Sequence, residues 1–269
     1  MDVKKTTLLV TDLDGTLLTR NQEISPENQQ AIKRLKERGG MFTFATGRTE
    51  EAVAPFARQL SLELPMILYN GARISHPLTG AVLYEATLTL PGGLWKELLR
   101  AASDGVAVLV YKDGDVYAPE RSELLERHEQ KDGVRCKPFP PELTGQPITK
   151  ILLIAELPEC LKALEEKIAI TGIACETVYS ESNYLEILPP RVSKGTALAE
   201  LVRMLQIQEL FVVTVGDNLN DLTMVKEADL GVAVANAHPL LKEAADTVTV
   251  HHEEHAIAAV IDRILKEAN

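Results

Sequence analysis

The chain has 269 residues, of which 45% are hydrophobic and 25% are charged, and its formal net charge is −11. Because nucleic-acid backbones require a basic protein surface, this charge argues against nucleic acid as a partner. No apolar run approaches the roughly 20 residues that span a bilayer, and the N-terminus lacks the apolar centre of a signal peptide, so we expect no membrane association and a cytoplasmic location.

Strand and helix patterns alternate over the first eighty residues. Apolar runs at 6–13, 41–47 and 65–71 predict strands, and amphipathic segments between them predict helices. Ser25 and Pro26 suit the N-cap and the first position of the first of these helices. The resulting β-α-β-α-β order is typical of a parallel sheet that carries helices on both faces.

The middle of the chain has a different pattern, in which short turns such as Asp113-Gly114 join strands into hairpins. Helices interrupt these hairpins, and strict alternation of strand and helix resumes only near Lys194. We therefore predict an α/β fold with a Rossmann-like, doubly wound parallel core and an inserted α+β cap that contains an antiparallel sheet. The predicted core is 1–82 and 188–269, and the predicted cap is 83–187.

Four short polar stretches occupy equivalent places in this predicted core. Each lies at the C-terminal end of a predicted parallel strand or at the start of the following helix. Ligands bind at that edge of open α/β sheets, so we expect the four stretches to meet around one crevice. The stretches are DLDGT (12–16), ATGR (45–48), SKGTAL (193–198) and GDNLND (216–221).

The residue types in these stretches predict phosphoryl-transfer chemistry. Asp12, Asp14 and Asp217 would repel one another unless a cation lay between them, and all-oxygen ligands suit Mg²⁺. Lys194 at a helix start and the hydroxyl of Thr46 would bind an anion. A metal, a lysine and free amides around one phosphate form a transition-state clamp. One carboxylate would then attack phosphorus and form an aspartyl-phosphate.

These motifs resemble those of the haloacid dehalogenase-like superfamily, and the order core, inserted cap, core resembles its Cof-type phosphatases. The family's first motif, Asp-x-Asp-Gly-Thr, is matched by residues 12–16, and its fourth, Gly-Asp-x-x-Asn-Asp, by residues 216–221. Thr46 matches the Thr or Ser of the second motif, and Lys194 matches the lysine of the third. The resemblance implies a Mg²⁺-dependent phosphohydrolase that acts on a small phosphomonoester.

The resemblance also implies a role for each residue. Asp12 would be the nucleophile, and Asp14 would protonate the leaving oxygen and then activate water. The metal would be held by the Asp12 and Asp217 carboxylates and by the backbone carbonyl of Asp14. Asp221 would support the metal and the lysine from the second shell. The residues that would hold the phosphate are Thr46, Gly47, Lys194 and Asn220.

Several residues of the same regions have open roles. Arg191 stands where the family often has glycine, and it either stiffens the linker or adds a cation to the mouth of the site. Asn70 lies at the predicted exit from core to cap and is a candidate to face the site. Arg48 is interpreted as an ion-pair partner, with substrate binding as the alternative. HHEEH (251–255) is interpreted as a solvated helix start, with adventitious metal binding as the alternative.

Other functions remain open at this point. A phosphotransferase or sugar-phosphate mutase would use the same aspartyl-phosphate and pass the phosphoryl group to a hydroxyl. A non-catalytic phosphate-binding module is a third hypothesis, although none of the four motifs is broken. Sugar phosphates, a phosphorylated flavin precursor and pyridoxal phosphate are all compatible with the resemblance, because the cap would select the leaving group. The chain is expected to be a monomer or a homodimer.

Overall fold

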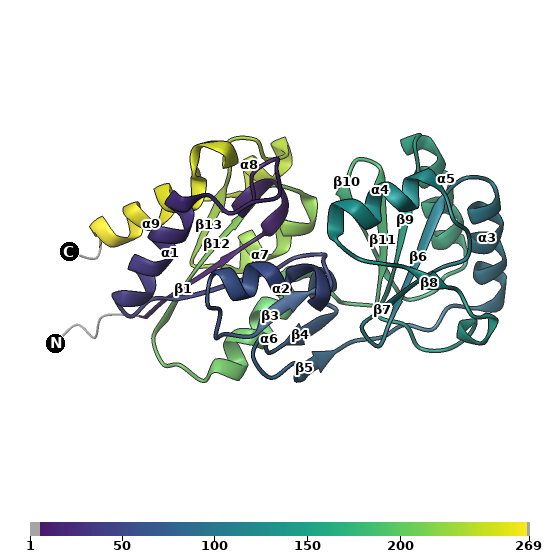
Figure 1. Ribbon diagram of the computed structural model, residues 1–269, viewed down its shortest axis with the longest axis horizontal. Helices are drawn as coiled ribbons and strands as arrows, with labels where there is room; N and C mark the ends of the chain where they lie inside the picture. The colour runs from purple at the N-terminus through teal and green to yellow at the C-terminus, as the bar shows by residue number, and fades with distance from the viewer. Residues whose placement is uncertain (1–5, 268–269) are drawn as a thin grey trace. The chain divides into compact units, whose positions relative to one another are not determined.

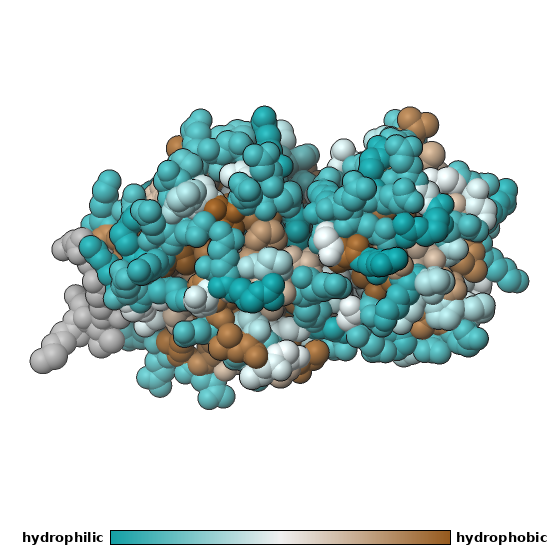
Figure 2. Space-filling model, in the orientation of Figure 1, coloured by the Kyte–Doolittle hydropathy of each residue, from teal (hydrophilic) through white to brown (hydrophobic). Residues whose placement is uncertain are grey.

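The computed structural model describes residues 6–267, which form two compact units (Figure 1). Unit 1 contains residues 1–47, 53–83 and 193–269, and unit 2 contains residues 48–52 and 84–192. Over the described residues, no helix is long and apolar enough to cross a membrane. Hydrophilic side chains cover most of the face seen in Figure 2, which agrees with the strongly negative net charge.

Unit 1 is built on a five-stranded parallel sheet in the order β14-β13-β12-β1-β2. The two central strands are rich in β-branched and leucine residues and are buried on both faces, as in α/β proteins. The prediction of a doubly wound parallel core is therefore confirmed. The strands are β1 (Thr6–Thr11), β2 (Met41–Phe44), β12 (Leu210–Gly216), β13 (Leu230–Ala233) and β14 (Thr247–Val248).

Helices alternate with these strands along the chain. The first helix begins as predicted, because Pro26 is its first residue and the Ser25 Oγ atom accepts a hydrogen bond from the backbone N–H of Asn28 at 3.2 Å. The first and last helices, α1 and α9, lie side by side (Figure 1). The helices are α1 (Pro26–Glu37), α2 (Glu50–Gln59), α6 (Lys194–Leu205), α7 (Leu222–Glu227), α8 (Pro239–Ala244) and α9 (Ala256–Glu267).

The predicted strand at 65–71 is present as β3 (Met66–Leu68), but it does not form a ladder in the five-stranded parallel sheet. β3 instead pairs antiparallel with β4 (Arg73–Ser75), in a small sheet of order β3-β4-β5 that ends with β5 (Val82–Glu85). β3 lies beside the segment after β2 and forms a parallel bridge there, between Ala45 and Ile67, in which the Thr46 N–H donates to the Ile67 carbonyl at 2.9 Å. The chain reverses at Tyr69–Gly71, where all three residues have positive φ, so the next segment returns along β3.

Unit 2 contains a six-stranded sheet in the order β10-β11-β9-β6-β7-β8, in which only the β7–β8 pair is parallel. Asp113 and Gly114 both have positive φ, as a two-residue hairpin turn of type I′ requires. The predicted α+β unit with an antiparallel sheet is thereby confirmed. The strands are β6 (Ala107–Lys112), β7 (Asp115–Ala118), β8 (Lys137–Pro138), β9 (Lys150–Ile154), β10 (Glu176–Glu181) and β11 (Tyr184–Leu188).

Three helices complete unit 2, and two of them share its core with one face of the sheet. Trp95 is 1% exposed in this core, and its ring centroid lies 5.4 Å from that of Phe139. Leu98 and Leu161 pack into the same cluster from the two helices. The three helices are α3 (Gly92–Ser103), α4 (Glu123–Asp132) and α5 (Pro158–Ile170).

A buried ion pair joins two neighbouring strands of the unit 2 sheet. The Nζ atom of Lys150 on β9 donates to the Oε2 atom of Glu186 on β11 at 2.7 Å, and each side chain is only 2–3% exposed. The same Nζ atom lies 4.5 Å from the centre of the Tyr111 ring. Leaving one of these buried charges without the other lowers the stability of the fold strongly. We therefore expect the two side chains to be tolerated only together.

We predict that Lys150→Met and Glu186→Gln each destabilise unit 2 by about 3 kcal/mol, because each leaves one buried charge without its counter-charge. The double variant Lys150→Met/Glu186→Leu should recover most of this loss, because neither charge then remains. Urea unfolding followed by the fluorescence of Trp95, the single tryptophan of the chain, measures both effects. Additive losses in the double variant would contradict the assigned pairing.

Candidate active site

The central pair of parallel strands brings two of the predicted motifs together. β1 and β12 are hydrogen-bonded neighbours, and the chain continues from them toward opposite edges of the sheet. Asp12 follows β1 directly, and its backbone N–H donates to the Val215 carbonyl at 2.9 Å. Asp217 follows β12 directly. Both aspartates thus lie at the carboxyl ends of the strands, at the switch point where such sheets bind ligands.

A buried lysine bridges two of the predicted carboxylates. The Nζ atom of Lys194 donates to Asp12 Oδ1 and to Asp221 Oδ1, both at 2.6 Å. Lys194 and Asp221 are completely buried, and Asp12 is 5% exposed. Lys194 is the first residue of α6, whose N-terminus is fixed by reciprocal hydrogen bonds between Ser193 and Thr196. The start of α6 therefore places the ammonium group between Asp12, which follows β1, and Asp221, which lies in the short helical turn after β12.

The carboxylate of Asp217 lies close to those of Asp12 and Asp221. Its Oδ1 atom accepts a hydrogen bond from the Thr16 hydroxyl at 3.3 Å. A Cβ atom on Gly15 would lie 2.5 Å from Asp217 Oδ2, and Gly15 has a φ of +74°. Only glycine satisfies both conditions, which explains its place in the first motif. Oxygens of Asp12, Asp217 and Asp221 consequently lie within 4.8 Å of one another.

The electrostatics of this cluster are dominated by burial. Burial raises the pKa of Asp12 from its ordinary 3.8 to about 7, and the nearby Lys194 offsets this only in part. Burial and the charges of Asp12 and Asp221 raise the pKa of Asp217 well above its ordinary value. Burial alone would lower the pKa of Lys194, but Asp12 and Asp221 outweigh it and hold the lysine protonated.

The donor set fits a small divalent cation. Hard, oxygen-only donors suit Mg²⁺, and a cation among them would favour the charged forms of Asp12 and Asp217, which burial and mutual repulsion disfavour. Asp221 is less available as a direct ligand, because Oδ1 accepts from Lys194 and Oδ2 accepts from the N–H groups of Asp217 and Asn218. These contacts agree with the supporting role expected for Asp221, and they favour Asp12 and Asp217 as the metal-binding carboxylates.

Asp14 has a different environment from Asp12. It lies in the turn Leu13–Leu17, is half-buried, and its carboxylate is outside the group formed by Asp12, Asp217 and Asp221. This placement separates the two aspartates of the first motif. One is a buried partner of Lys194, whereas the other is more open to solvent and so better able to exchange protons with it.

The second motif lies beside the first. The Ala45 N–H donates to the Thr11 carbonyl at 2.9 Å, which places Thr46 next to Asp12 at the edge of the sheet. Thr46 is 1% exposed, and its backbone carbonyl accepts from the Asn70 N–H at 2.9 Å. Gly47 follows as the last residue of this segment of unit 1. The second motif and the β3 turn are thus held together by backbone hydrogen bonds.

Asn70, left open by the sequence, contacts the fourth motif. The Nδ2 atom of Asn220 donates to Asn70 Oδ1 at 3.1 Å. This leaves Asn70 Nδ2 and Asn220 Oδ1 buried without a hydrogen-bond partner among the described residues. Unsatisfied buried polar atoms are rare in native proteins, and at a ligand site they indicate groups that a ligand completes.

The sequence analysis missed a second layer of residues behind the aspartates. Asn236 Nδ2 donates to the Gly15 carbonyl at 2.8 Å, and the N–H of His238 donates to the Asp217 carbonyl at 2.7 Å. Asn236 and His238 lie in the loop after β13. Their position after an apolar strand is the sequence signal that could have identified them, as it did for Asp12 and Asp217. Thr16 lies inside the first motif, but the hydrogen bond from its hydroxyl to Asp217 was not predicted.

The segment HHEEH lies just before α9 and keeps Glu253 and Glu254 exposed, as expected for a solvated helix start, but one of its histidines is buried. His252 is 8% exposed, and its Nδ1 atom lies 2.8 Å from the Leu18 carbonyl oxygen. His251 and His255 flank a short helical turn, and α9 begins only at Ala256, so the two histidines do not share a helix face. A buried histidine that anchors the turn after the first motif replaces the expected exposed one.

The two arginines with open roles group with unit 2 and are not part of this cluster. Arg48 is buried at 5% exposure. Arg191 is exposed, and its φ of +63° lies in the left-handed region that favours glycine. Its N–H donates to Glu176 Oε1 at 2.9 Å, a bond that helps to hold this conformation. The backbone thus accounts for the glycine that the family often has at this position.

The similarity of this chain to known proteins extends over nearly its whole length. A family model for haloacid dehalogenase-like hydrolases matches residues 9–261. A 5-amino-6-(5-phospho-D-ribitylamino)uracil phosphatase of Bacillus subtilis is 30% identical, over 94% of this chain and 96% of its own. An HMP-PP phosphatase of Cronobacter sakazakii is 32% identical, over 86% of this chain and 84% of its own.

A solved structure gives the same picture for the fold. The crystal structure of a haloacid dehalogenase-like hydrolase from Bacteroides thetaiotaomicron has a TM-score of 0.82, with 27% sequence identity. The similarity covers 97% of this chain and 100% of that one. With its parallel core, its separate antiparallel sheet and all four motifs in order, the chain belongs to the haloacid dehalogenase-like hydrolase family and is a phosphatase, a phosphoric monoester hydrolase.

Proposed function

We propose that the protein is a Mg²⁺-dependent phosphohydrolase that removes phosphate from a small phosphomonoester through an aspartyl-phosphate on Asp12. The main support is the buried Lys194, which bridges Asp12 and Asp221 beside Asp217 at the switch point of the sheet. The desolvation penalty of buried charges can exceed their attraction, so a buried lysine–carboxylate group is weak support for stability. It is therefore the kind of arrangement that is expected at a functional site.

The proposed reaction has two steps. An oxygen of Asp12 attacks phosphorus, and the bond from phosphorus to the leaving oxygen breaks while Asp14 donates a proton to that oxygen. Water then attacks the phosphorus of the aspartyl-phosphate, and Asp14 takes a proton from the water. Inorganic phosphate leaves, and Asp12 returns to its carboxylate form. Asp14 suits this exchange of protons because it is half-buried, whereas Asp12 is tied to Lys194.

The phosphate would be held by donors from three motifs. Lys194 contributes a charge that its acidic partners keep protonated. Thr46 and Gly47 lie beside Asp12 at the end of β2, and Asn220 extends from the fourth motif. We add Asn70 to the predicted set, because its buried Nδ2 donor has no partner among the described residues and a phosphate oxygen would supply one.

The metal site would use the Asp12 and Asp217 carboxylates and the Asp14 backbone carbonyl, with Asp221 in support. When bound, Mg²⁺ would neutralise negative charge on the phosphate oxygens. The chain's own contribution is to hold these oxygens together. Thr16 orients Asp217, Gly15 permits the close approach, and Asp221 holds the backbone at Asp217.

We propose a small phosphorylated metabolite as substrate, with unit 2 as the domain that selects the leaving group. The named relatives act on a phosphoribitylamino-uracil and on HMP-PP, which are both small phosphorylated metabolites. The names of the relatives do not favour the phosphotransferase or mutase alternative. A panel of phosphorylated metabolites, compared by kcat/KM, would identify the substrate.

We predict opposite kinetic signatures for substitutions of the two aspartates of the first motif. With 4-nitrophenyl phosphate, whose leaving group needs no acid, Asp14→Asn should release about one equivalent of nitrophenolate per enzyme in a burst. Turnover should then be slower than in the wild type by roughly 100-fold or more, because the water lacks its base. Asp12→Asn should give neither burst nor turnover, because no phosphoenzyme forms. Stopped-flow absorbance measures both.

Asp104→Asn is the matched control, because Asp104 is exposed and its 3.7 Å ion pair with Arg100 lies on the surface. It should have wild-type kinetics. Turnover by Asp12→Asn near the wild-type rate would contradict the assignment of the nucleophile. A burst by Asp12→Asn but none by Asp14→Asn would reverse the two roles.

We predict that Mg²⁺ affinity rises with pH across neutrality. The metal-free pKa of Asp12 is about 7, so the carboxyl is protonated at pH 5.5 and must lose its proton before it binds metal. Raising the pH to 7.5 removes that competition and should tighten binding by at least about tenfold. Isothermal titration calorimetry measures the affinity, and the proton released shows as a dependence of the heat on buffer ionisation.

Asp217→Asn should weaken Mg²⁺ binding by more than about tenfold, because it removes one anionic donor. Asp104→Asn is again the control for the loss of one negative charge. A Mg²⁺ affinity that does not change between pH 5.5 and 7.5, or that Asp217→Asn leaves intact, would show that the cation binds elsewhere.

A further inference from the structure

The segment HHEEH (251–255) has no part in the proposed reaction, although it lies against the turn that carries Asp14. It joins β14 to α9 in unit 1, and its short helical turn, His252–Glu254, contacts the turn Leu13–Leu17. His252 is buried at 8% exposure, while the two glutamates beside it are exposed. An acidic start of α9 accounts for the glutamates but not for a buried histidine at this place.

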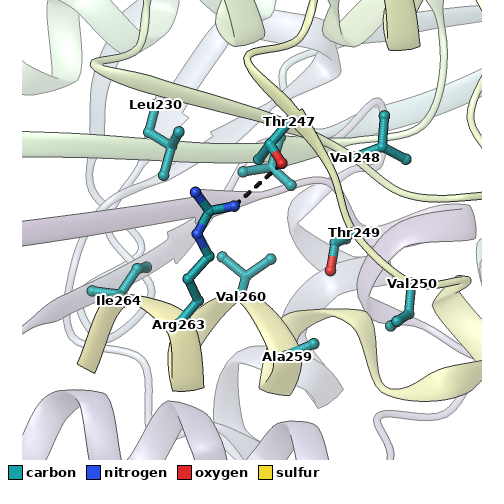
Figure 3. A pocket seen from close by; sticks show the side chains of 10 residues that line it. Leu230, Thr247, Val248, Thr249, Val250, Ala259, Val260, Arg263 and Ile264 are labelled. Carbon is teal, nitrogen blue, oxygen red and sulfur yellow. Dashed lines mark hydrogen bonds between the residues drawn. The ribbon is translucent and has the colours of Figure 1, made fainter. Parts of the chain in front are cut away.

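The segment that carries this histidine is held at both ends. Before it, the Thr249 N–H donates to the Ala233 carbonyl at 2.8 Å, which ties the chain to the end of β13. After it comes α9, which lines a pocket together with β14 (Figure 3). There the Nη1 atom of Arg263 on α9 donates to the Thr247 hydroxyl on β14 at 3.2 Å. His252 therefore starts from a backbone that is fixed to the parallel sheet.

His252 and its neighbour Asn236 hold two carbonyl groups next to Asp14 in sequence. The Nδ1 atom of His252 lies 2.8 Å from the Leu18 carbonyl oxygen, just after the turn. The His252 N–H donates to Asn236 Oδ1 at 3.0 Å, and Asn236 Nδ2 donates to the Gly15 carbonyl at 2.8 Å. Because Gly15 directly follows Asp14, these bonds fix the backbone on the C-terminal side of the Asp14 carboxylate.

Two other residues of HHEEH hold the chain that follows this turn. The Oε1 atom of Glu253 accepts a hydrogen bond from the Arg20 N–H at 2.7 Å, and the Nδ1 atom of His255 lies 3.0 Å from the Ser25 hydroxyl. The same five-residue segment thus contacts the chain from the end of the first motif to the N-cap of α1. Its histidines and Glu253 form a set of contacts with one continuous piece of chain.

We propose that His252, together with Asn236, is a positioning residue for Asp14, and that it holds the Asp14 carboxylate where it can exchange protons with the leaving oxygen and with water. This role rests on the proposed function and extends it. Proton transfer needs the two groups within hydrogen-bond reach, so a loosened turn should slow the steps that use Asp14. The attack by Asp12 should be spared, because Asp12 is held separately by Lys194.

The contact at Leu18 also says which variants test it. A carbonyl oxygen can only accept, so the Nδ1 atom of His252 carries the hydrogen and donates it. Asparagine carries its Nδ2 donor at the same number of bonds from the backbone, whereas leucine fills the buried position without any donor. His252→Asn and His252→Leu therefore separate the hydrogen bond from the space that the side chain fills.

The kinetic test uses stopped-flow absorbance with 4-nitrophenyl phosphate, whose leaving group needs no acid. His252→Leu should keep a burst of about one equivalent of nitrophenolate, and its later turnover should fall by about tenfold or more, because the water is poorly placed for its base. His252→Asn should recover most of that turnover. His76→Leu is the matched control, because the His76 Nδ1 atom accepts from the nearby Leu78 N–H, and it should have wild-type kinetics. Circular dichroism melting confirms that the variants are folded.

A double substitution shows whether His252 acts through Asp14. Once Asp14 is asparagine, the position of its side chain no longer matters for proton transfer. Asp14→Asn/His252→Leu should therefore turn over within about twofold of Asp14→Asn alone. Losses that multiply in the double variant, a lost burst in His252→Leu, or no recovery in His252→Asn would overturn the proposal. If His252→Leu does not fold, Asn236→Ala at a half-buried position gives the same comparison.

Amide hydrogen exchange tests the same contacts without any turnover. The Leu18 N–H donates to the Leu13 carbonyl at 2.9 Å, so its exchange reports opening of the turn. Exchange in residues 13–18 should be faster by about tenfold or more in His252→Leu, and close to the wild-type rate in His252→Asn and His76→Leu. Unchanged exchange in His252→Leu would overturn the proposal. Absence of turnover by the wild type would overturn the proposed function, whereas the exchange rates would still show whether His252 holds the turn.

Discussion

The burial of Lys194 between Asp12 and Asp221 is the constraint on which the rest of the site depends. When all groups are ionised, the two buried carboxylates and the half-buried one of Asp217 face one ammonium, because Asp217 belongs to the same cluster. Burial, together with this excess of negative charge, raises the pKa values of Asp12 and Asp217. The metal-free protein relieves that excess by holding protons more tightly, and a divalent cation would relieve it by direct neutralisation.

Backbone geometry brings the members of this cluster together. The switch point of the parallel sheet brings Asp12 and Asp217 to adjacent strand ends, and α6 begins where its first residue can reach both sides. Gly216 has a steric role like that of Gly15, because a Cβ atom there would lie 2.5 Å from the Cβ atom of Asp221. The glycines of these motifs are therefore required by the backbone geometry, as the charged residues are by the proposed chemistry.

The sequence predicted what local pattern determines, and it failed where distant segments meet. Alternating strands and helices gave the parallel core, and the four motifs gave the site, because each lies at a strand or helix end. The strand at 65–71 was predicted, but the reversal that pairs it with β4 was not, because Tyr69 and Asn70 adopt positive φ without being glycine. The contact of Asn70 with Asn220 joins residues 150 positions apart, so no local pattern contains it.

The two aspartates of the first motif show how one strand end makes two different groups. Asp12 keeps extended geometry beside β12 and is buried against Lys194, whereas Asp14 lies in the turn that Gly15 allows and keeps access to solvent. On the proposed mechanism, a nucleophile must be fixed in place, and a proton carrier must exchange with water between steps. Moving two residues along the chain separates these requirements. The two aspartates have identical side chains. Their proposed roles therefore differ because of their surroundings, which are the turn for Asp14 and the buried lysine for Asp12.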